Sequence, residues 1–226
     1  MNRRMLTFGL ASTALGAASL CIAQPGVRRL FALRRGWSFV PSVTVLSTEQ
    51  DDPRLPLVGD AVAFWNKVLA EIATPFRLGA VTQLAGAIPV EDLKMLSLNT
   101  VGTGRSAELP ESVRRITGNM VVALSDGNFI SFASRPAPGD RALVAIKDHR
   151  LYPLTLPNVV RNVIAHELGH AIGLFHNDDP TTLMCGRPAP CRPDVFASEH
   201  ARYFPLSEIE KDNLRRMYPP TWRPAH

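Results

Sequence analysis

The sequence predicts one compact domain of the α+β class, and three observations support this. Short runs of β-branched and apolar residues have the length of strands, a longer segment repeats its apolar residues at three- and four-residue steps, and no internal repeat is present. With 226 residues, of which 46% are hydrophobic, the chain can bury a sizeable core. This composition excludes a wholly disordered chain and, with only three cysteines, a disulfide-dense mini-protein.

The first elements follow from local patterns. The sequence SVTVLST at 42–48 has the β-branched alternation of a strand. Apolar residues at helical spacing then predict a helix over 56–72 with one buried face. Phe76–Leu78 is expected to open a second strand.

Further strands are expected towards the middle of the chain. Residues 119–125 (NMVVALS) form an apolar run typical of a buried strand, and 126–128 (DGN) are typical of a turn. Residues 142–147 (ALVAIK) predict another strand. The segment 84–118 carries glycine, proline and mixed charges and predicts no particular element.

Residues 1–23 are predicted to be a signal peptide. Arg3 and Arg4 precede an uncharged stretch, residues 5–23, that is rich in small residues and only mildly apolar. We expect cleavage near Gln24 and export to the periplasm or the extracellular space. The alternative is a retained membrane anchor formed by residues 5–23, because this length is close to that of a bilayer-spanning segment. A membrane partner is expected only in that case.

Residues 24–41 are basic and irregular, and we expect them to be a mobile lead-in. The formal charge of the chain is +5, and removing 1–23, which holds two arginines and no acids, leaves +3. The arginines of the lead-in suggest an anionic-surface binder as an alternative function. No basic run alternates with aromatic residues, so we expect no nucleic-acid partner. We also expect a monomer.

The segment 157–176, PNVVRNVIAHELGHAIGLFH, carries the residues most typical of chemistry. Its apolar residues recur at helical spacing. His166 and His170 are four residues apart, so their imidazoles lie on one face of this helix, one turn apart, where both can bind one zinc ion. Glu167 directly follows the first of these ligands.

The pattern continues beyond the helix. Gly173 is suited to end the helix sharply, which lets the chain turn so that His176 approaches the same ion. The complete pattern, HExxHxxGxxH, fixes five positions and is much more specific than HExxH alone. Three histidines leave the fourth tetrahedral position of zinc open, as in catalytic sites, so the sequence predicts one catalytic Zn²⁺.

Two cysteines remain after removal of the signal peptide, Cys185 and Cys191. In an exported protein, a pair six positions apart predicts a short-loop disulfide. The alternatives are two free thiols or a thiolate metal site, and the latter is disfavoured because no other cysteine is present to complete it.

On these residues the chain resembles the matrixin branch of the metzincins, the group that contains the matrix metalloproteinases. The extended histidine pattern is the metzincin signature, and the resemblance is sharpest from Leu156 to Met184. It extends more loosely to a final helix near the end of the chain. The resemblance implies that 42–220 is one zinc metallopeptidase domain, followed by a short tail at 221–226.

The resemblance also implies a fold. It predicts a zincin-like single domain with a twisted, mostly parallel sheet packed on two long helices, and a small C-terminal subdomain that ends in a third helix. Ser207 and Glu210 are spaced as a capping box at the start of that helix. Met184 is expected to form the Met-turn, an apolar floor beneath the three imidazoles.

The chain departs from the matrixin pattern in places. Asn177 follows the third histidine where matrixins usually have serine, and Cys185 follows the methionine where they often have tyrosine. The structural calcium site of the family is not apparent, since Asp126, Asp148 and His149 are more typical of turn or surface residues. Structural Ca²⁺ is therefore left open.

The predicted function is an exported zinc-dependent endopeptidase that acts on a protein or peptide substrate. Zinc would activate a water molecule for attack on the peptide bond, with Glu167 as the general base. We expect an extended substrate to pair with an exposed edge of the strand at 142–147, unless that strand is interior. Residues 186–190 are expected to form the wall of the pocket just beyond the scissile bond. The alternative is a secreted zinc-containing binding module without proteolytic activity, and the intact Glu167 argues against it.

Overall fold

The structure, a computed structural model, describes residues 36–103 and 106–225. The predicted signal peptide and most of the predicted lead-in lie outside the described residues. Within the described part of the chain, none of the helices combines the length and the apolar character that crossing a bilayer requires.

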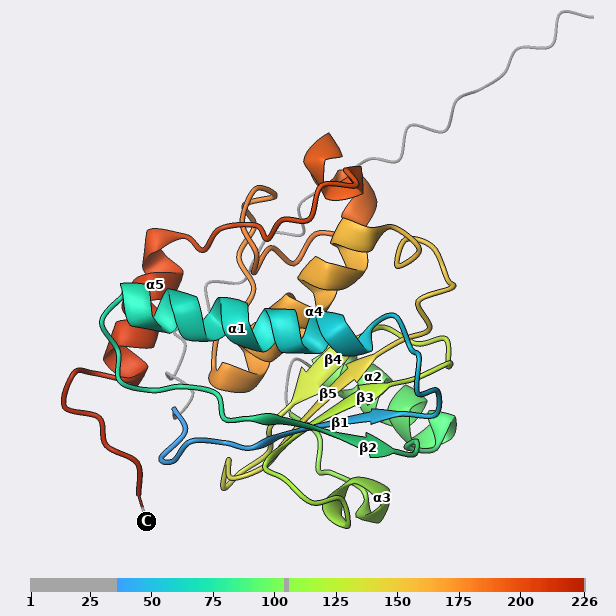
Figure 1. Cartoon of the computed structure of the whole chain (residues 1–226), viewed down its shortest axis with the longest axis horizontal. Helices are drawn as coiled ribbons and strands as arrows, with labels where there is room; N and C mark the ends of the chain where they lie inside the picture. Colours follow the sequence, from blue (N-terminus) through green and yellow to red (C-terminus); the bar gives the residue numbers. More distant parts are fainter. Residues whose placement is uncertain (1–35, 104–105, 226) are drawn as a thin grey trace, which may run out of the picture.

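A five-stranded sheet forms the middle of the molecule (Figure 1). Its strands are β1 (Val43–Ser47), β2 (Val81–Ala85), β3 (Met120–Leu124), β4 (Phe132–Ser134) and β5 (Ala142–Ile146), in the spatial order β2-β1-β3-β5-β4. β1 is parallel to β2 and β3, and β3 is parallel to β5, while β4 runs antiparallel to β5. Parallel neighbours need crossover connections. α1 (Leu55–Glu71) lies in the connection from β1 to β2, α2 (Val90–Thr103) and α3 (Glu111–Arg114) lie between β2 and β3, and the connection from β3 to β5 contains β4.

Helices cover both faces of this sheet. α1 and α4 (Pro157–Ile172) share one apolar core with the sheet, and α2 and α3 share a second core on the other face. α5 (Glu208–Met217) lies beside the end of α1 (Figure 1). Two short 3-10 turns, η1 (Ala189–Cys191) and η2 (Asp194–Ala197), lie between α4 and α5 in the chain.

Alternation along the strands explains the two cores. In β3, Met120 and Val122 belong to the core with α1 and α4, while Val121 and Ala123 belong to the core with α2 and α3. Because both faces are covered, β1, β3 and β5 are buried at every position. Near-continuous apolar strands of this kind are typical of parallel sheets between two helical layers.

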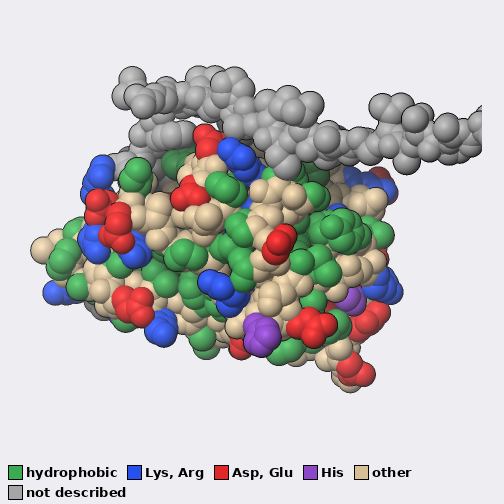
Figure 2. Space-filling model, turned by 90° about the horizontal axis from the view of Figure 1, so that it is seen from above, with side chains coloured by type: hydrophobic (Ala, Val, Ile, Leu, Met, Phe, Trp, Pro, Cys, Tyr) green, Lys and Arg blue, Asp and Glu red, His purple; other side chains and the backbone are tan. Residues whose placement is uncertain are grey.

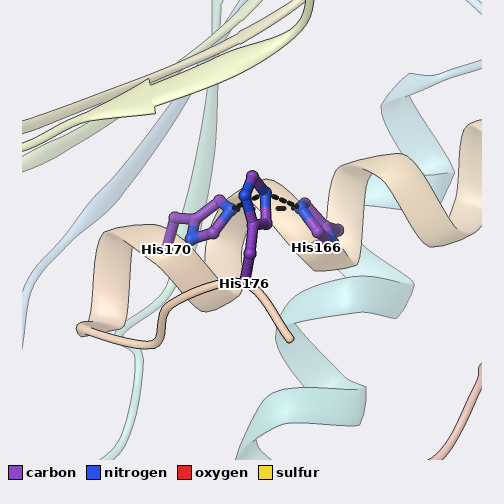
Figure 3. A group of neighbouring side chains, drawn as sticks. All are labelled: His166, His170 and His176. Carbon is purple, nitrogen blue, oxygen red and sulfur yellow. Dashed lines mark hydrogen bonds between the residues drawn. The ribbon is translucent and has the colours of Figure 1, made fainter. Parts of the chain in front are cut away.

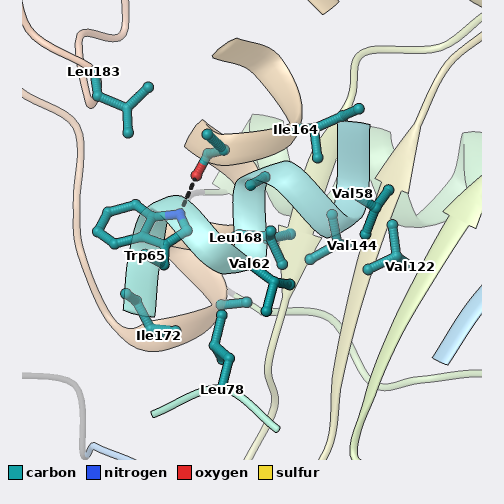
Figure 4. Packing of buried hydrophobic residues seen from close by; sticks show 14 of the residues in the cluster. Val58, Val62, Trp65, Leu78, Val122, Val144, Ile164, Leu168, Ile172 and Leu183 are labelled. Carbon is teal, nitrogen blue, oxygen red and sulfur yellow. Dashed lines mark hydrogen bonds between the residues drawn. The ribbon is translucent and has the colours of Figure 1, made fainter. Parts of the chain in front are cut away.

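Trp65 fixes α1 against α4. Its indole Nε1 donates a hydrogen bond of 2.9 Å to the carbonyl oxygen of Ala165 (Figure 4). The ring is fully buried in the same core as Leu168 and Ile172 of α4. The helix that carries the histidine motif is therefore held in place by the packing of α1 and not only by its own propensity.

The predicted fold class is confirmed. The strands expected at 42–48, 119–125 and 142–147 are β1, β3 and β5, and the helix expected at 56–72 is α1. The capping box of the last helix is present, because the Ser207 hydroxyl accepts from the Glu210 backbone N–H and the Glu210 carboxylate accepts from that of Ser207.

The second strand was placed wrongly. It begins at Val81 and not at Phe76–Leu78. Phe76 and Leu78 are core residues of an irregular segment, and the Phe76 ring stacks on that of Tyr218 with their centroids 3.9 Å apart. Their apolar character therefore reflects burial and not strand pairing.

The segment without a predicted element, 84–118, contains α2 and α3, which add the second helical layer. α2 buries Leu93 and Leu96 but leaves Met95 and Leu98 largely exposed. Apolar residues therefore lie on both sides of α2, which obscures the helical period. β4 has only three residues and shows no alternation long enough to recognise.

Residues on either side of the predicted domain, 42–220, pack against it. Trp37, in the predicted lead-in, is buried, and its indole donates to the carbonyl oxygen of Ala171 at 3.0 Å. Its backbone N–H donates to the Tyr218 hydroxyl, and Trp222, in the predicted tail, donates to the carbonyl oxygen of Trp37. The two ends of the described chain are thus packed together at the end of α4.

Charges of both signs are mixed on the surface. The face shown in Figure 2 carries acidic and basic side chains close to one another, with apolar side chains between them. Several exposed pairs lie within one helical turn, such as Lys94 with Glu91 and Lys211 with Glu208. Exposed pairs of this kind contribute about 0–1 kcal/mol each, so they do not determine the fold.

Candidate metal centre

Three imidazoles meet at the end of α4 (Figure 3). His166 and His170 lie one turn apart on the helix, and His176 follows the turn after the helix. Their Nε2 atoms are 3.0 Å apart between His166 and His170, 3.0 Å between His166 and His176, and 2.9 Å between His170 and His176. Among the described residues, they are the one group of three or more ligand-type side chains that could hold a metal ion.

Gly173 makes this convergence possible. It ends α4 with φ of 118°, in the left-handed region. Its N–H donates to the carbonyl oxygen of His170, and the N–H of Leu174 donates to that of Gly169. Glycine adopts such a conformation without a steric cost. The chain therefore reverses within a few residues, and His176 returns to the face that carries the other two rings.

The tautomers of the two helical histidines follow from their other ring nitrogens. Nδ1 of His166 lies 2.8 Å from the carbonyl oxygen of Leu183, and Nδ1 of His170 lies 2.9 Å from that of Leu174. A carbonyl oxygen only accepts, so both Nδ1 atoms carry the proton and both Nε2 atoms present a lone pair. Two lone pairs 3.0 Å apart cannot form a hydrogen bond, so this contact favours a cation between the rings.

The spacing fits zinc. Nitrogen ligands lie about 2.0–2.1 Å from zinc in tetrahedral sites, which places them about 3.3 Å from one another. The observed Nε2–Nε2 distances of 2.9–3.0 Å are a few tenths of an ångström shorter. Neutral imidazole nitrogens are also ligands that zinc prefers. The three residues therefore fit the metal that the sequence predicts.

Burial determines the charge states beside this group. Removal from water lowers the pKa of His166 to about 3, with smaller contributions from His176 and Arg192, so its ring is neutral at neutral pH, as metal binding requires. Burial also raises the pKa of Glu167 to about 8. Within the described part of the chain, no hydrogen bond or ion pair stabilises the Glu167 carboxylate. A dication close by would favour its ionised form.

Met184 lies directly against the helix of the motif. It is fully buried, and a Cβ added at Gly169 would come within 2.5 Å of its Sδ and 2.8 Å of the Trp65 ring. Only glycine at 169 allows this approach. The preceding residue, Leu183, accepts the hydrogen bond from His166. The structure thus places the predicted Met-turn residue beneath the turn of α4 that bears the ligands.

The sequence did not indicate how the loop after His176 is held. The Asn177 amide donates to the Glu210 carboxylate at 2.5 Å, and the Asn177 backbone N–H donates to the carbonyl oxygen of Met184 at 2.9 Å. Burial raises the pKa of Glu210, against the opposing hydrogen bonds from Ser207 and Asn177. Asn177 was noted only as a departure from the matrixin pattern, and its position next to His176 was the one available signal.

The predicted Cys185–Cys191 disulfide is wrong. Cys185 is a buried free thiol. Its Sγ lies 3.4 Å from the backbone N–H of Arg187, and its backbone pairs with Asn177 in an isolated β-bridge. The local backbone is therefore organised by hydrogen bonds around the metal centre, and a short covalent loop is not needed there.

The predicted substrate edge is also wrong. β5 is an interior strand, paired with β3 on one side and β4 on the other. The edge strand on this side of the sheet is β4, which packs against α4. An extended peptide that joins the sheet next to the motif helix would therefore have to pair with β4.

The remaining residues considered in the sequence lie elsewhere. Asp126 and Asp148 both form ion pairs with Arg150, at 3.1 Å and 2.9 Å, and His149 lies beside Asp148. Of the predicted pocket wall at 186–190, Ala189 and Pro190 line a cavity between the loop and α4. The other described ligand-type residues are thus not gathered around a second centre.

Comparison with known proteins leaves the family open. No protein-family model matches the chain. Among solved structures, archaemetzincin from Methanopyrus kandleri is similar to this chain, with 18% identity, a TM-score of 0.49, and coverage of 80% of this chain and 96% of that chain. The identity and the TM-score are both too low for this likeness to support any statement about function. The metal centre itself therefore carries the functional argument.

Proposed function

We propose that this protein is a zinc-dependent endopeptidase of the matrixin-like metzincin type. One observation carries the proposal. Three imidazole Nε2 atoms converge to within 2.9–3.0 Å, two of them present lone pairs, and a buried carboxylate without a described partner directly follows the first ligand. This combination is of little use to a purely structural site, which would have four ligands and no acid beside it.

In the proposed reaction, His166, His170 and His176 would hold the zinc ion through Nε2. Bound zinc would supply Lewis acidity that polarises a peptide carbonyl and lowers the pKa of a water molecule. Glu167 would take one proton from the water as the water oxygen attacks the carbonyl carbon. It would then pass that proton to the leaving nitrogen as the C–N bond breaks. The carbonyls of Leu183 and Leu174 keep His166 and His170 in the tautomer that the metal needs.

Further observations support the matrixin type. The glycine turn at 173, the buried Met184 and the capping box at Ser207 all occur at the positions that the resemblance implies. We also propose that residues 1–23 direct export. Mass spectrometry of the secreted protein should find an N-terminus near Gln24, and an intact Met1 would contradict removal of the signal peptide.

Cleavage-site profiling with a broad peptide library tests the proposed activity. The protein loaded with zinc should cleave peptides, and a chelator should abolish cleavage. Glu167→Gln should keep zinc but lose cleavage, because the amide cannot take the proton from water. Full cleavage by Glu167→Gln would overturn the role of Glu167, and chelator-insensitive cleavage would overturn the role of zinc. Zinc content measured on the same samples distinguishes loss of metal from loss of chemistry.

A further inference from the structure

A small cavity lies between the first half of α4 and the loop that carries η1 and η2. It has a volume of about 140 Å³. Leu156 and Val159 form part of its wall on the helix side, and Phe196 forms part of its wall on the loop side. Liquid water occupies about 30 Å³ per molecule, so the cavity has room for four or five non-hydrogen atoms. It can therefore take one unbranched side chain.

Arg192 brings a positive charge to this cavity, and it is the single cation among the lining residues. Its guanidinium group donates to the carbonyl oxygens of Thr182 at 2.6 Å and Cys185 at 3.4 Å. It also lies over the rings of Phe196 and Phe204, 5.0 Å and 4.6 Å from their centroids. Carbonyl dipoles and ring faces therefore surround the charge.

No carboxylate of the described part of the chain forms a close ion pair with Arg192, and Asp179 acts on its charge only from farther away. Asp194 lines the same cavity but is exposed and forms no ion pair with Arg192. The Nε of Arg192 is buried and has no hydrogen-bond partner. A partly buried cation without a close ion pair is stabilised when a carboxylate pairs with it directly. The cavity is thus suited to an acidic group.

The cavity lies within reach of a peptide bound at the metal centre. Val159 precedes His166 by seven residues, or two helical turns, which corresponds to about 10.5 Å along α4. An extended peptide advances about 3.3 Å per residue, so three residues span this distance. In addition, Arg192 donates hydrogen bonds to the carbonyl oxygens of Thr182 and Cys185, which flank Leu183–Met184. The carbonyl oxygen of Leu183 in turn accepts a hydrogen bond from His166.

We infer that this cavity selects an acidic side chain of the substrate within three residues of the scissile bond, and that Arg192 recognises its carboxylate. The inference rests on the proposed peptidase function and adds a substrate class to it. Glutamate has five side-chain atoms, so its methylenes would contact the apolar walls and its carboxylate would pair with the guanidinium group of Arg192, which lines the cavity. Glutamine has the same shape without the charge. A charged hydrogen bond supports a preference for glutamate of about tenfold or more.

Paired peptide pools test this inference. Each pair of fluorescent hexapeptide pools differs only in having glutamate or glutamine at one fixed position, and all six positions are scanned. The zinc-loaded protein should cleave the glutamate pool about tenfold faster at one position. Binding of the same pools to zinc-loaded Glu167→Gln, measured by fluorescence anisotropy, should show the same preference. Equal binding and equal cleavage at every position would overturn the inference.

The two measurements separate this inference from the proposed function. If no pool is cleaved but Glu167→Gln still binds glutamate pools more tightly, the cavity assignment stands and the peptidase proposal fails. If pools are cleaved in a chelator-sensitive way without a preference for glutamate, the peptidase proposal stands and the cavity assignment fails.

Three variants locate the preference. Arg192→Gln should remove it, but this change also removes the bonds to Thr182 and Cys185. Asp194→Asn touches none of those bonds and removes a negative charge from the cavity wall, so it should raise the glutamate-to-glutamine ratio about twofold, as expected for a partly exposed charge. Arg202→Gln, an exposed arginine of the same segment outside the cavity wall, should leave the ratio unchanged. An unchanged ratio in both Arg192→Gln and Asp194→Asn would contradict the assignment.

Discussion

The metal centre and the carboxyl ends of the central strands both bring polar side chains together, but they satisfy them differently. Beyond β1, β3 and β5, the buried Arg54 guanidinium group is bonded to the buried Asp52 carboxylate at 2.7 Å. It also donates to the carbonyl oxygens of Ser125 and Lys147. At the metal centre, by contrast, the Nε2 lone pairs of His166 and His170 face one another at 3.0 Å.

This difference shows which buried polar groups call for an ion. Arg54 already supplies the positive charge that Asp52 and the strand-end carbonyls need. Burial alone would raise the pKa of Asp52, but its hydrogen bonds and charge interaction with Arg54 outweigh burial, and the net pKa is lowered. The histidine group contains no such internal cation. The charges of the first region are therefore balanced within the chain, and the second region has the ligands to hold a metal ion.

The largest effect is expected from a substitution that breaks the Arg54–Asp52 pair at the strand ends. Arg54→Met removes the guanidinium group at similar length and leaves the buried Asp52 carboxylate without its counter-ion, with only the hydrogen bonds from the Ser47 hydroxyl and the backbone N–H of residue 54. Breaking a buried pair in this way costs about 3–5 kcal/mol, which for a domain of this size lowers Tm by about 6–20 °C. Thermal unfolding followed by circular dichroism measures the change.

The matched control for this variant is Lys67→Met. Lys67 pairs with Glu71 at 3.9 Å on the exposed side of α1, and loss of such a pair should cost less than about 0.5 kcal/mol. Arg54→Met should also retain its zinc, because Arg54 lies outside the ligand group. A similar destabilisation in both variants would mean that the buried pair has no special role.

The second largest effect is expected from zinc binding to the histidine group. Zinc at 100 times its Kd should stabilise the protein by about 2.7 kcal/mol, equivalent to a rise in Tm of about 5–10 °C. His176→Ala should abolish this rise, and because His176 is the exposed member of the group, the metal-free stability should change little. A zinc-dependent rise that persists in His176→Ala would place the metal elsewhere.

The sequence predicts the metal centre well because its residues are encoded locally. His166, His170 and Gly173 lie within a single helix and its end, and the geometry of that helix alone places two of the rings together. Arg192 and Glu210 could not be found in this way. Their roles depend on contacts across tens of residues, such as the bond from Arg192 to the carbonyl oxygen of Thr182 and the bond from Asn177 to Glu210.

The same distinction applies to the fold. β1, β3 and β5 were predictable because burial on both faces makes them apolar throughout. The interior position of β5 was not predictable, because it depends on β4, a three-residue strand that pairs with it from the outside. Cys185 shows a similar limit, since spacing alone cannot tell whether a buried thiol is paired.

A smaller effect on stability is expected at low pH, where the contribution of Asp52 to the strand-end region should be lost. The pKa of Asp52 in the folded protein lies below its ordinary value of 3.8. Its contribution to stability is therefore fully present above that value and is lost as the pH falls through the lower, folded value. The difference in unfolding free energy between the wild type and Asp52→Asn should be constant from pH 7 to pH 5 and should shrink below about pH 4.

Urea titrations at each pH, carried out with a chelator so that loss of zinc does not contribute, measure this difference. Asp60→Asn is a suitable control, because Asp60 forms an exposed pair with Arg161, and its effect should be small at every pH. A difference for Asp52→Asn that keeps its full size below the ordinary pKa would contradict the assigned direction of the shift.

The smallest effect is expected from calcium, which should leave the protein unchanged where zinc stabilises it. Calcium needs six to eight oxygen ligands. The carboxylates at the strand ends are already engaged, Asp52 by Arg54, and Asp126 and Asp148 by Arg150. Calcium at 1 mM should therefore shift Tm of the zinc-loaded protein by less than about 1 °C. A rise comparable to that caused by zinc would show that these carboxylates leave their arginines to bind a cation, and the contrast between the two regions would no longer hold.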